Sequence, residues 1–244
     1  MKRPSALNVE KLLLYEDNHL LVLNKPGGLL VQADRTGDPT LLEAAKAYLK
    51  EKYHKPGRVY LGLVHRLDRV TSGVIIFAKT SKAARRLSQA FREGQVQKYY
   101  LAVVEGGPPP EKTLEDYLAW DPVRKKAYLS PEGKKALLTW RLLKKGRKES
   151  LLLVEPGTGR KHQIRAQLAA HGFPIVGDLK YGSPRKIAAG RAILLHAWRI
   201  RLSHPTKKEI LVFEAPLPPY WPGNFHPDEG KNSPNIFAYR ANLS

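Results

Sequence analysis

The sequence predicts an α+β fold with a mixed, mainly antiparallel sheet. Apolar residues recur at strand spacing in several short segments and at helical spacing in a few others, so both kinds of element are present. Strands and helices do not alternate regularly, and two strand pairs are joined by tight turns, which argues against a purely parallel sheet. We expect two lobes with a central cleft, divided at the proline-rich turn 106–110.

The first third of the chain is expected to contain a hairpin, a helix and a buried strand. Residues 11–28 predict two short strands around a turn at 16–18. The helix start signal at 38–40 precedes apolar residues at helical spacing over 41–49. Residues 73–79, GVIIFAK, are almost wholly apolar, which is typical of a strand buried on both faces.

The middle of the chain adds a second helix and a further strand. Thr80 or Ser81 can cap a helix that runs through Phe91 and ends at Gly94. The strand that follows covers 96–106.

The last third is expected to be rich in hairpins. Residues 106–149 predict hairpins after the proline-rich turn, and 150–172 predict a strand, a tight turn and a helix that Gly172 terminates. Residues 194–216 predict a strand pair around a turn near His204.

Since no linker-like segment divides the chain cleanly, we place one domain at 1–220. Residues 221–244 are treated as a C-terminal tail of unknown role, because they carry much proline and asparagine.

The charge of the chain indicates a polyanionic partner. There are 42 Lys and Arg residues against 22 Asp and Glu, which gives a net charge of +20 in 244 residues. Nucleic acid is the expected partner, with an anionic membrane surface or a merely solubilising charge as the alternatives. No segment combines a basic face with exposed large apolar residues, so a membrane role is disfavoured.

Several kinds of chemistry and location are excluded or disfavoured. The chain has no cysteine, which rules out disulfides and thiolate sites and suits a reducing compartment. It shows no signal peptide, transit peptide or membrane-length apolar run, so we expect a cytoplasmic protein. Phosphate-loop, serine-hydrolase and zinc-protease motifs are missing, the histidines are scattered without ligand spacing, and metal chemistry is not expected.

Asp68 lies in the stretch HRLDRVTSG, residues 65–73, between Arg66 and Arg69. On its own, an aspartate here is more often a turn anchor that accepts backbone N–H groups. The alternative is chemical: an ionised carboxylate between two cations can act as a nucleophile or base. The two arginines are candidates for binding phosphates.

Tyr100 and Lys98 share one face of the strand at 96–106, and Tyr99 points to the other. Tyr100 is either an ordinary strand aromatic or a cleft residue. In a cleft it could stack on a flipped base or accept a proton.

The stretch TGRKHQIRAQLAAHG, residues 158–172, predicts a basic helix. Lys161 and Arg165 are four apart, so on a helix they would share a face. That face is either simply solvated or placed to pair Arg165 with an active-site anion.

Five segments together resemble the RluA-type pseudouridine synthases. They are NKPGGLLV at 24–31, HRLDRVTSGVIIFAK at 65–79, KYYLAVVEG at 98–106, GTGRKHQIRAQLAAHGFPIVGDLKYG at 157–182 and LLHAWRI at 194–200. They occur in the family's order and reach from about residue 12 to about residue 217.

This resemblance implies a pseudouridine synthase catalytic core that isomerises uridine in ribosomal or transfer RNA without a cofactor. It places Asp68 at the catalytic aspartate, Tyr100 at the active-site tyrosine and Arg165 at the arginine that pairs with the aspartate. The residues expected to bind substrate RNA are Arg66, Arg69, Lys98, Arg160, Lys161, His162 and Leu194.

Two departures from the family pattern stand out. The first strand begins near residue 12, which leaves no room for the small S4-type RNA-binding domain of some members. Gln167 stands where many members have histidine, a change that could alter local RNA contacts.

A non-catalytic RNA-binding or RNA-folding factor on the same fold is the alternative function. The sequence leaves open which RNA and which uridine are modified, and whether Asp68 acts on the ribose or on the uracil ring. A monomer is the default expectation for the oligomeric state.

Overall fold

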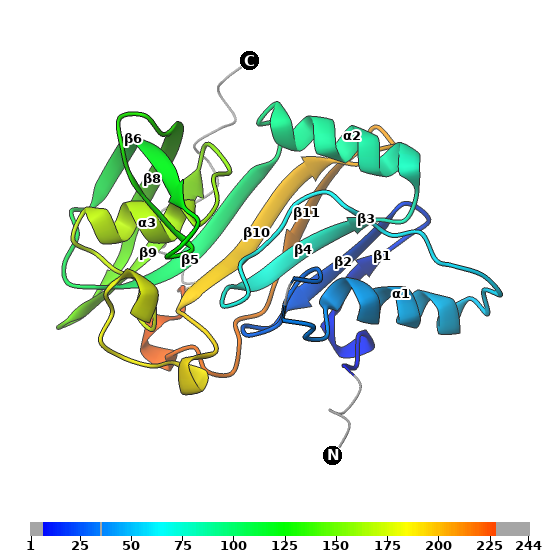
Figure 1. The fold of residues 1–244 in the computed structure, drawn as a ribbon, viewed down its shortest axis with the longest axis horizontal. Helices are drawn as coiled ribbons and strands as arrows, with labels where there is room; N and C mark the ends of the chain where they lie inside the picture. Colours follow the sequence, from blue (N-terminus) through cyan, green and yellow to red (C-terminus); the bar gives the residue numbers. More distant parts are fainter. Residues whose placement is uncertain (1–6, 35, 228–244) are drawn as a thin grey trace.

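The computed structural model describes residues 7–34 and 36–227 of the chain. Within them, eleven strands form one sheet in the order β1-β2-β4-β10-β5-β9-β8-β6-β7, with β3 beside β4 and β11 beside β10 (Figure 1). Of the described strand pairs, only β4 and β10 run parallel. The predicted α+β fold with a mixed, mainly antiparallel sheet is therefore confirmed.

The strands are β1 (Leu13–Glu16), β2 (Leu20–Lys25), β3 (Gly62–Leu63), β4 (Ser72–Ala78), β5 (Gln97–Glu105), β6 (Glu111–Asp121), β7 (Lys126–Leu129), β8 (Lys134–Lys145), β9 (Glu149–Pro156), β10 (Leu195–Ser203) and β11 (Ile210–Glu214). The α-helices of the described residues are α1 (Leu41–Lys52), α2 (Ser81–Arg92) and α3 (Gln163–Ala170). Short 3-10 turns are η1 (Glu10–Leu12), η2 (Leu179–Tyr181), η3 (Ala188–Gly190) and η4 (Gly223–Phe225).

Helices α1 and α2 begin where the sequence predicts. The Thr40 hydroxyl accepts a hydrogen bond from the Glu43 N–H, and the Thr80 hydroxyl accepts one from the Ala83 N–H. Each threonine thus satisfies one of the unpaired N–H groups of the first helical turn. Of the two candidate caps for α2, Thr80 is the one used.

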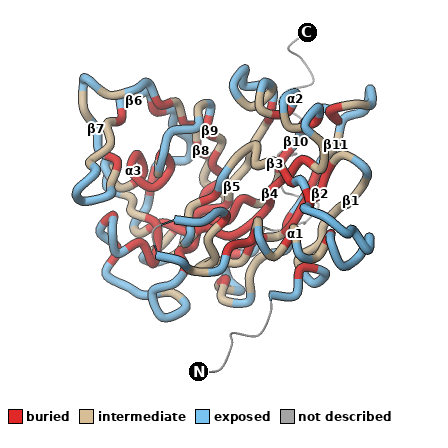
Figure 2. The backbone as a smooth tube through the Cα atoms, turned by 45° about the vertical axis from the view of Figure 1, so that its right-hand side comes forward, coloured by how far each residue is buried: buried red, intermediate tan, exposed pale blue. Residues whose placement is uncertain are grey.

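Strands β2 and β4 are buried on both faces, because each face packs against its own core (Figure 2). Leu21, Leu23, Ile75 and Phe77 face the core that contains the apolar side of α1. Leu20, Val22, Val74 and Ile76 face the core that contains Ala83 and Leu87 of α2. The predicted two-sided burial of residues 73–79 is confirmed, since every residue of β4 is buried.

The other half of the sheet is also covered on both faces. Ile164 and Leu168 of α3 pack on one face of β5, β8 and β9, as their helical spacing predicts. Trp221 and Phe225 pack on the opposite face and are 5% and 2% exposed. The boundary expected at residue 220 therefore falls inside a packed segment, and the rest of the expected tail, 228–244, lies outside the described residues.

The two halves meet at β10, and the sheet divides along this strand. His196 and Ala197 of β10 pair with β4, whereas Arg199 to Ser203 pair with β11 instead. On its other side β10 pairs with β5 from Leu195 to Arg201, with a bulge at Trp198 opposite Tyr99 and Tyr100. Bulges of this kind redirect side chains and are frequent next to functional sites.

Beyond this division, a side chain replaces a strand as the partner of β4. The Ile76 N–H donates to Nε2 of His65 at 2.9 Å, so the chain just before Asp68 is attached to a central strand.

The expected division of the lobes at residues 106–110 is wrong. This turn joins β5 to β6, and both strands lie in the same half of the sheet as α3 (Figure 1). The halves are instead separated between α2 and β5, because β5 leaves the α2 side and runs along β10. Within the described residues, no helix is long and apolar enough to cross a lipid bilayer.

Candidate active site

A cavity of about 1080 Å³ opens between the two halves of the sheet. Its walls come from the Asp68 loop (residues 64–71), the first residues of β5, the β9–α3 loop (residues 157–162) and the end of α2. The sequence-predicted residues that line it are Arg66, Asp68, Arg69, Lys98, Tyr100, Arg160, Lys161, His162 and Arg165.

Asp68 and Arg165 form an ion pair at the bottom of this cavity. Arg165 Nη1 donates to Asp68 Oδ2 at 2.9 Å, and the two residues are 97 positions apart in the chain. The Arg165 side chain is 6% exposed and that of Asp68 26% exposed. The predicted pairing of these residues is present in the structure, with the cation buried and the carboxylate accessible.

Asp178 is a partner of Arg165 that the sequence pattern did not single out. Its two carboxylate oxygens accept from Arg165 Nε at 2.7 Å and Nη2 at 2.9 Å, a bidentate arrangement. Burial disfavours the charge of Arg165, but the hydrogen bonds and attraction from Asp178 and then Asp68 outweigh it and raise the pKa of the guanidinium. The only sequence signal was its place in the matched segment 157–182.

Lys25 is a buried hydrogen-bond donor to the Asp68 loop. Its side chain is fully buried, and Nζ donates to the carbonyl oxygens of Pro26, Leu29 and Arg69. Burial lowers the pKa of Lys25 to about 7, although Asp68 partly opposes this effect. The lysine therefore joins the segment that follows β2 to the residue that follows Asp68.

Arg69 adds a second attachment on the surface. Its Nε donates to the Gly28 carbonyl at 3.0 Å, and its Nη1 donates to Asp38 Oδ2 at 2.7 Å. The side chain is 47% exposed and lines the cavity, yet two of its donors hold protein loops in place.

Tyr100 and Lys98 lie on the same face of β5, as the strand period predicts, and both line the cavity. Burial raises the pKa of the Tyr100 phenol above its ordinary value, and the charge of Asp68 adds to this effect. Burial also lowers the pKa of Lys98. Lys98 Nζ lies 3.5 Å from the Thr158 carbonyl of the opposite wall.

His162 lies beside Asp68 in a left-handed backbone conformation, with φ at 54°. Its Nδ1 is 2.9 Å from the Tyr181 hydroxyl, which accepts a hydrogen bond from the Ala127 N–H. The phenol proton is then free to point at Nδ1, which leaves the proton of a neutral His162 on Nε2. Nε2 is 3.8 Å from Asp68 Oδ2, and burial lowers the pKa of His162 to about 4.

Lys161 precedes α3, so it does not share a helical face with Arg165 as the four-residue spacing predicts. The helix begins at Gln163, after the left-handed residue His162 breaks the helical path. Lys161 Nζ lies instead over the ring of Trp120, 3.5 Å from its centroid.

Two further expectations do not fit the structure. Leu194 packs in the core on the face away from the cavity, and the next residue, Leu195, lines the cavity instead. Gln167 is fully buried, and its Nε2 donates to Asp116 and to the Ala136 carbonyl. It therefore lies in the protein interior and is not placed to contact RNA.

The cavity thus brings a supported carboxylate, a tyrosine and several cations together in one cleft. A family model described as RNA pseudouridylate synthase matches residues 19–170, which is more than half of the chain. The matched range includes Asp68, Tyr100 and Arg165. The chain belongs to the RNA pseudouridylate synthase family.

Relatives of this pseudouridine synthase share most of its length. Ribosomal large subunit pseudouridine synthase C of Vibrio cholerae serotype O1 is 37% identical over 223 residues, which are 88% of this chain and 69% of that protein. The dual-specificity RNA pseudouridine synthase RluA of Escherichia coli K12 is 35% identical over 208 residues, 84% of this chain and 92% of that protein. These matches support an RluA-type synthase, an isomerase that converts uridine in RNA to pseudouridine.

A solved structure has a similar fold. The human RNA pseudouridylate synthase domain containing 4 superimposes with a TM-score of 0.73 at 26% identity, covering 87% of this chain and 90% of that one.

Proposed function

We propose that this pseudouridine synthase uses Asp68 as its catalytic carboxylate on a uridine of ribosomal or transfer RNA. The observation that carries the proposal is the accessible Asp68 carboxylate, held by buried Arg165 at 2.9 Å in a cavity also lined by Tyr100. Ribosomal RNA as substrate is supported by the name of the Vibrio cholerae relative, a ribosomal large subunit synthase.

The reaction breaks the bond from N1 of uracil to C1′ of ribose, turns the base and joins C5 to C1′. The uridine must first leave its stack, which costs a few kcal/mol. A carboxylate can open this sequence by attacking or deprotonating the ribose, or by adding to the uracil ring. An enclosing cavity keeps the detached uracil in place until the new bond forms.

Arg165 keeps Asp68 ionised and oriented in this scheme. A buried cation with three hydrogen bonds to two carboxylates holds a fixed direction, so it fixes the position of the carboxylate as well. His162 lies beside the same oxygen, with Nε2 at 3.8 Å, and in its neutral form it lines the pocket around Asp68 and is not a cation for phosphate.

Tyr100 acts through its ring in this scheme. A phenol with a raised pKa stays protonated at neutral pH, so it is poorly suited to removing the C5 proton. A ring in the cavity near Asp68 is suited to stacking on the displaced uracil.

The exposed cations around the cavity, Arg66, Arg160 and Lys161, bind the RNA backbone in this proposal. We keep a monomer as the active form in this proposal. The absence of cysteine from the sequence agrees with a cytoplasmic location.

The variant Asp68→Asn tests the catalytic assignment. We expect it to abolish pseudouridine formation, while RNA binding stays within about tenfold, or about 1.4 kcal/mol. Carbodiimide mapping of the product measures the first quantity and fluorescence anisotropy the second. Asp121→Asn, at the end of β6 and outside the cavity, is the matched control and should retain activity. A folded Asp68→Asn protein that still forms pseudouridine would falsify the assignment.

Pseudouridine mapping of total RNA, with and without the gene, identifies the substrate. Loss of a single modified position in ribosomal or transfer RNA is the expected result. An unchanged map of both RNA classes would contradict the proposed substrate.

A further inference from the structure

The cavity extends beyond the surroundings of Asp68. Its volume of about 1080 Å³ lies at the upper end of ligand pockets, which measure about 300–1,000 Å³, and its lining extends from the Asp68 loop to the end of α2. Besides the part around Asp68, it has a second part, which we call the α2 arm. The α2 arm is lined by Ser88, Phe91, Arg92, Gly94, Val96 and Gln97 on one side and by residues 157–160 on the other.

The α2 arm contains a fixed aromatic ring. Phe91 stacks on His65 with 4.7 Å between ring centroids and 19° between ring planes. His65 is itself bonded to the N–H of Ile76 in central strand β4. Phe91 is only partly buried and lines the cavity. A ring held in this way loses little conformational freedom when a base packs on it.

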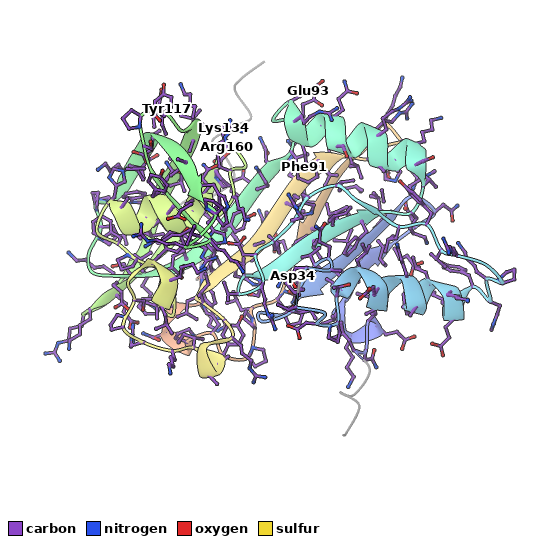
Figure 3. All side chains as sticks on the ribbon, in the orientation of Figure 1. Asp34, Phe91, Glu93, Tyr117, Lys134 and Arg160 are labelled. Carbon is purple, nitrogen blue, oxygen red and sulfur yellow. The ribbon has the colours of Figure 1, made fainter. Side chains whose placement is uncertain are left out.

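Two cations line the cavity together with this ring, one from each wall. Arg92 is exposed in the last turn of α2, one residue after Phe91. On the opposite wall, Arg160 is held by a hydrogen bond from its Nε to the Lys135 carbonyl at 2.9 Å. Figure 3 shows Phe91 at the end of α2 and Arg160 in the other half of the molecule, across the cleft. A positively charged groove that contains an aromatic ring for stacking is the usual arrangement for binding a single strand.

A purely structural explanation is available for each residue alone. Phe91 completes the apolar stripe of α2, and a cation in the last helical turn interacts favourably with the helix dipole. Neither explanation accounts for their meeting in one arm of the cavity that contains Asp68.

We propose that the α2 arm binds the nucleotide next to the target uridine, with its base on Phe91 and its phosphates between Arg92 and Arg160. This inference rests on the proposed function, since it extends the same cleft. It makes the α2 arm a determinant of RNA binding that the bond-breaking chemistry does not require.

Binding of a fluorescein-labelled octamer of oligouridylate tests the proposal. We expect Phe91→Leu and Arg92→Ala each to raise the Kd about tenfold, equivalent to about 1.4 kcal/mol. Arg92→Ala should also make the slope of log affinity against log salt shallower by about 0.7, the value for one phosphate contact to a single strand. With substrate RNA, both variants should raise KM and leave kcat within about twofold.

Arg85→Ala is the matched control, because it removes the same charge from the same helix outside the cavity. It should leave the Kd unchanged. The proposal fails if Phe91→Leu and Arg92→Ala bind the octamer as the wild type does. If Phe91→Leu has lost cooperative thermal unfolding, the exposed Arg92→Ala variant decides alone.

Failure of this inference is distinguishable from failure of the proposed function. If the Phe91 and Arg92 variants bind the octamer normally and Asp68→Asn is inactive, only the proposal for the α2 arm is contradicted. An active Asp68→Asn removes the catalytic assignment whatever the octamer shows.

Discussion

Arg165 serves two carboxylates with one guanidinium group. Asp178 takes two of its donors and Asp68 takes the third, so the aspartates are not equivalent. Asp178 is 1% exposed, and both of its carboxylate oxygens accept hydrogen bonds from Arg165. Both contacts of the Asp68 carboxylate with described side chains are made by Oδ2, which leaves Oδ1 uncommitted. One aspartate thus anchors the arginine, and the other is presented to the substrate.

Replacing Arg165 by lysine tests this arrangement, because lysine keeps the charge but lacks the planar fork. We expect turnover to fall by about 10- to 100-fold, since a charge-assisted hydrogen bond is worth about 1.5–3 kcal/mol. Single-turnover kinetics with saturating RNA measure the effect. Arg147→Lys, at an exposed turn, is the matched control. Equal rates for the two variants would reduce Arg165 to a nonspecific positive charge.

Complete removal of the side chain separates Arg165 from an ordinary surface cation. Arg165→Ala should slow single-turnover pseudouridine formation far more than Lys145→Ala, because Arg165 donates a hydrogen bond to the Asp68 carboxylate and Lys145 lies at the exposed end of β8. Equal effects of the two alanine variants would make Arg165 no more than an RNA contact.

At the level of elements, the contact between β4 and β10 determines where the Asp68 loop lies. Gly73 pairs with Ala197 in the parallel stretch and has φ at 116°. A Cβ atom at this position would lie 2.2 Å from the Ala197 carbonyl oxygen. Only glycine permits so close an approach of the two strands.

Gly73→Ala is therefore expected to destabilise the protein by about 2–5 kcal/mol, through backbone strain and a clash with backbone atoms that cannot move aside. Urea unfolding followed by circular dichroism gives the free energy of unfolding. Gly57→Ala is the control, since nothing lies within 4 Å of its added Cβ. If Gly73→Ala unfolds at the wild-type urea concentration, the strand contact is not as tight as described.

Most of these elements could be predicted from the sequence because their signals are local. Threonine caps, period-two alternation and the apolar run at 73–79 each act within a few residues. The partnership of Arg165 with Asp178 could not be predicted this way. It depends on a turn after α3 whose course is set by packing.

The same limit explains the wrong expectations at Lys161 and Leu194. Four-residue spacing places side chains on one face only inside a helix, and His162 begins α3 later than the pattern indicates. At Leu194 the motif lies next to the cavity as expected, but the Leu194 side chain points into the core and that of Leu195 lines the cavity. That choice depends on how β10 pairs with β4 and β5.

At the scale of the whole molecule, one buried histidine, His196, and two partly buried ones, His65 and His162, make stability depend on pH. Burial lowers the pKa of His65 to about 3, and those of His162 and His196 to about 4, from 6.5. Between pH 6.5 and 4 the unfolded chain binds protons at these sites and the native protein does not. The stability present above pH 6.5 is therefore lost as the pH falls, by at most about 1.4 kcal/mol per histidine per pH unit.

Urea unfolding at pH 7.5, 5.5 and 4.5 measures this loss. His196→Asn should make the decline with pH shallower, because one of the three sites is gone. His54→Asn is the control, since His54 is exposed and asparagine tolerates its left-handed backbone. Stability that is equal at pH 7.5 and 4.5 would contradict the assignment of these histidines as neutral.

The position of β10 has a consequence for how the molecule folds. Strands β1 to β4 and strands β5 to β9 each arise from continuous stretches of chain, but they are joined through residues 195–203. The Ser72–His196 contact joins residues that are 124 positions apart. Because closing so long a loop costs conformational entropy, we expect this contact to form late in folding. During synthesis, β4 and β5 cannot be joined in one sheet until β10 has been made, because β10 lies between them. The segment that completes the catalytic cleft thus leaves the ribosome after both of the halves that it joins.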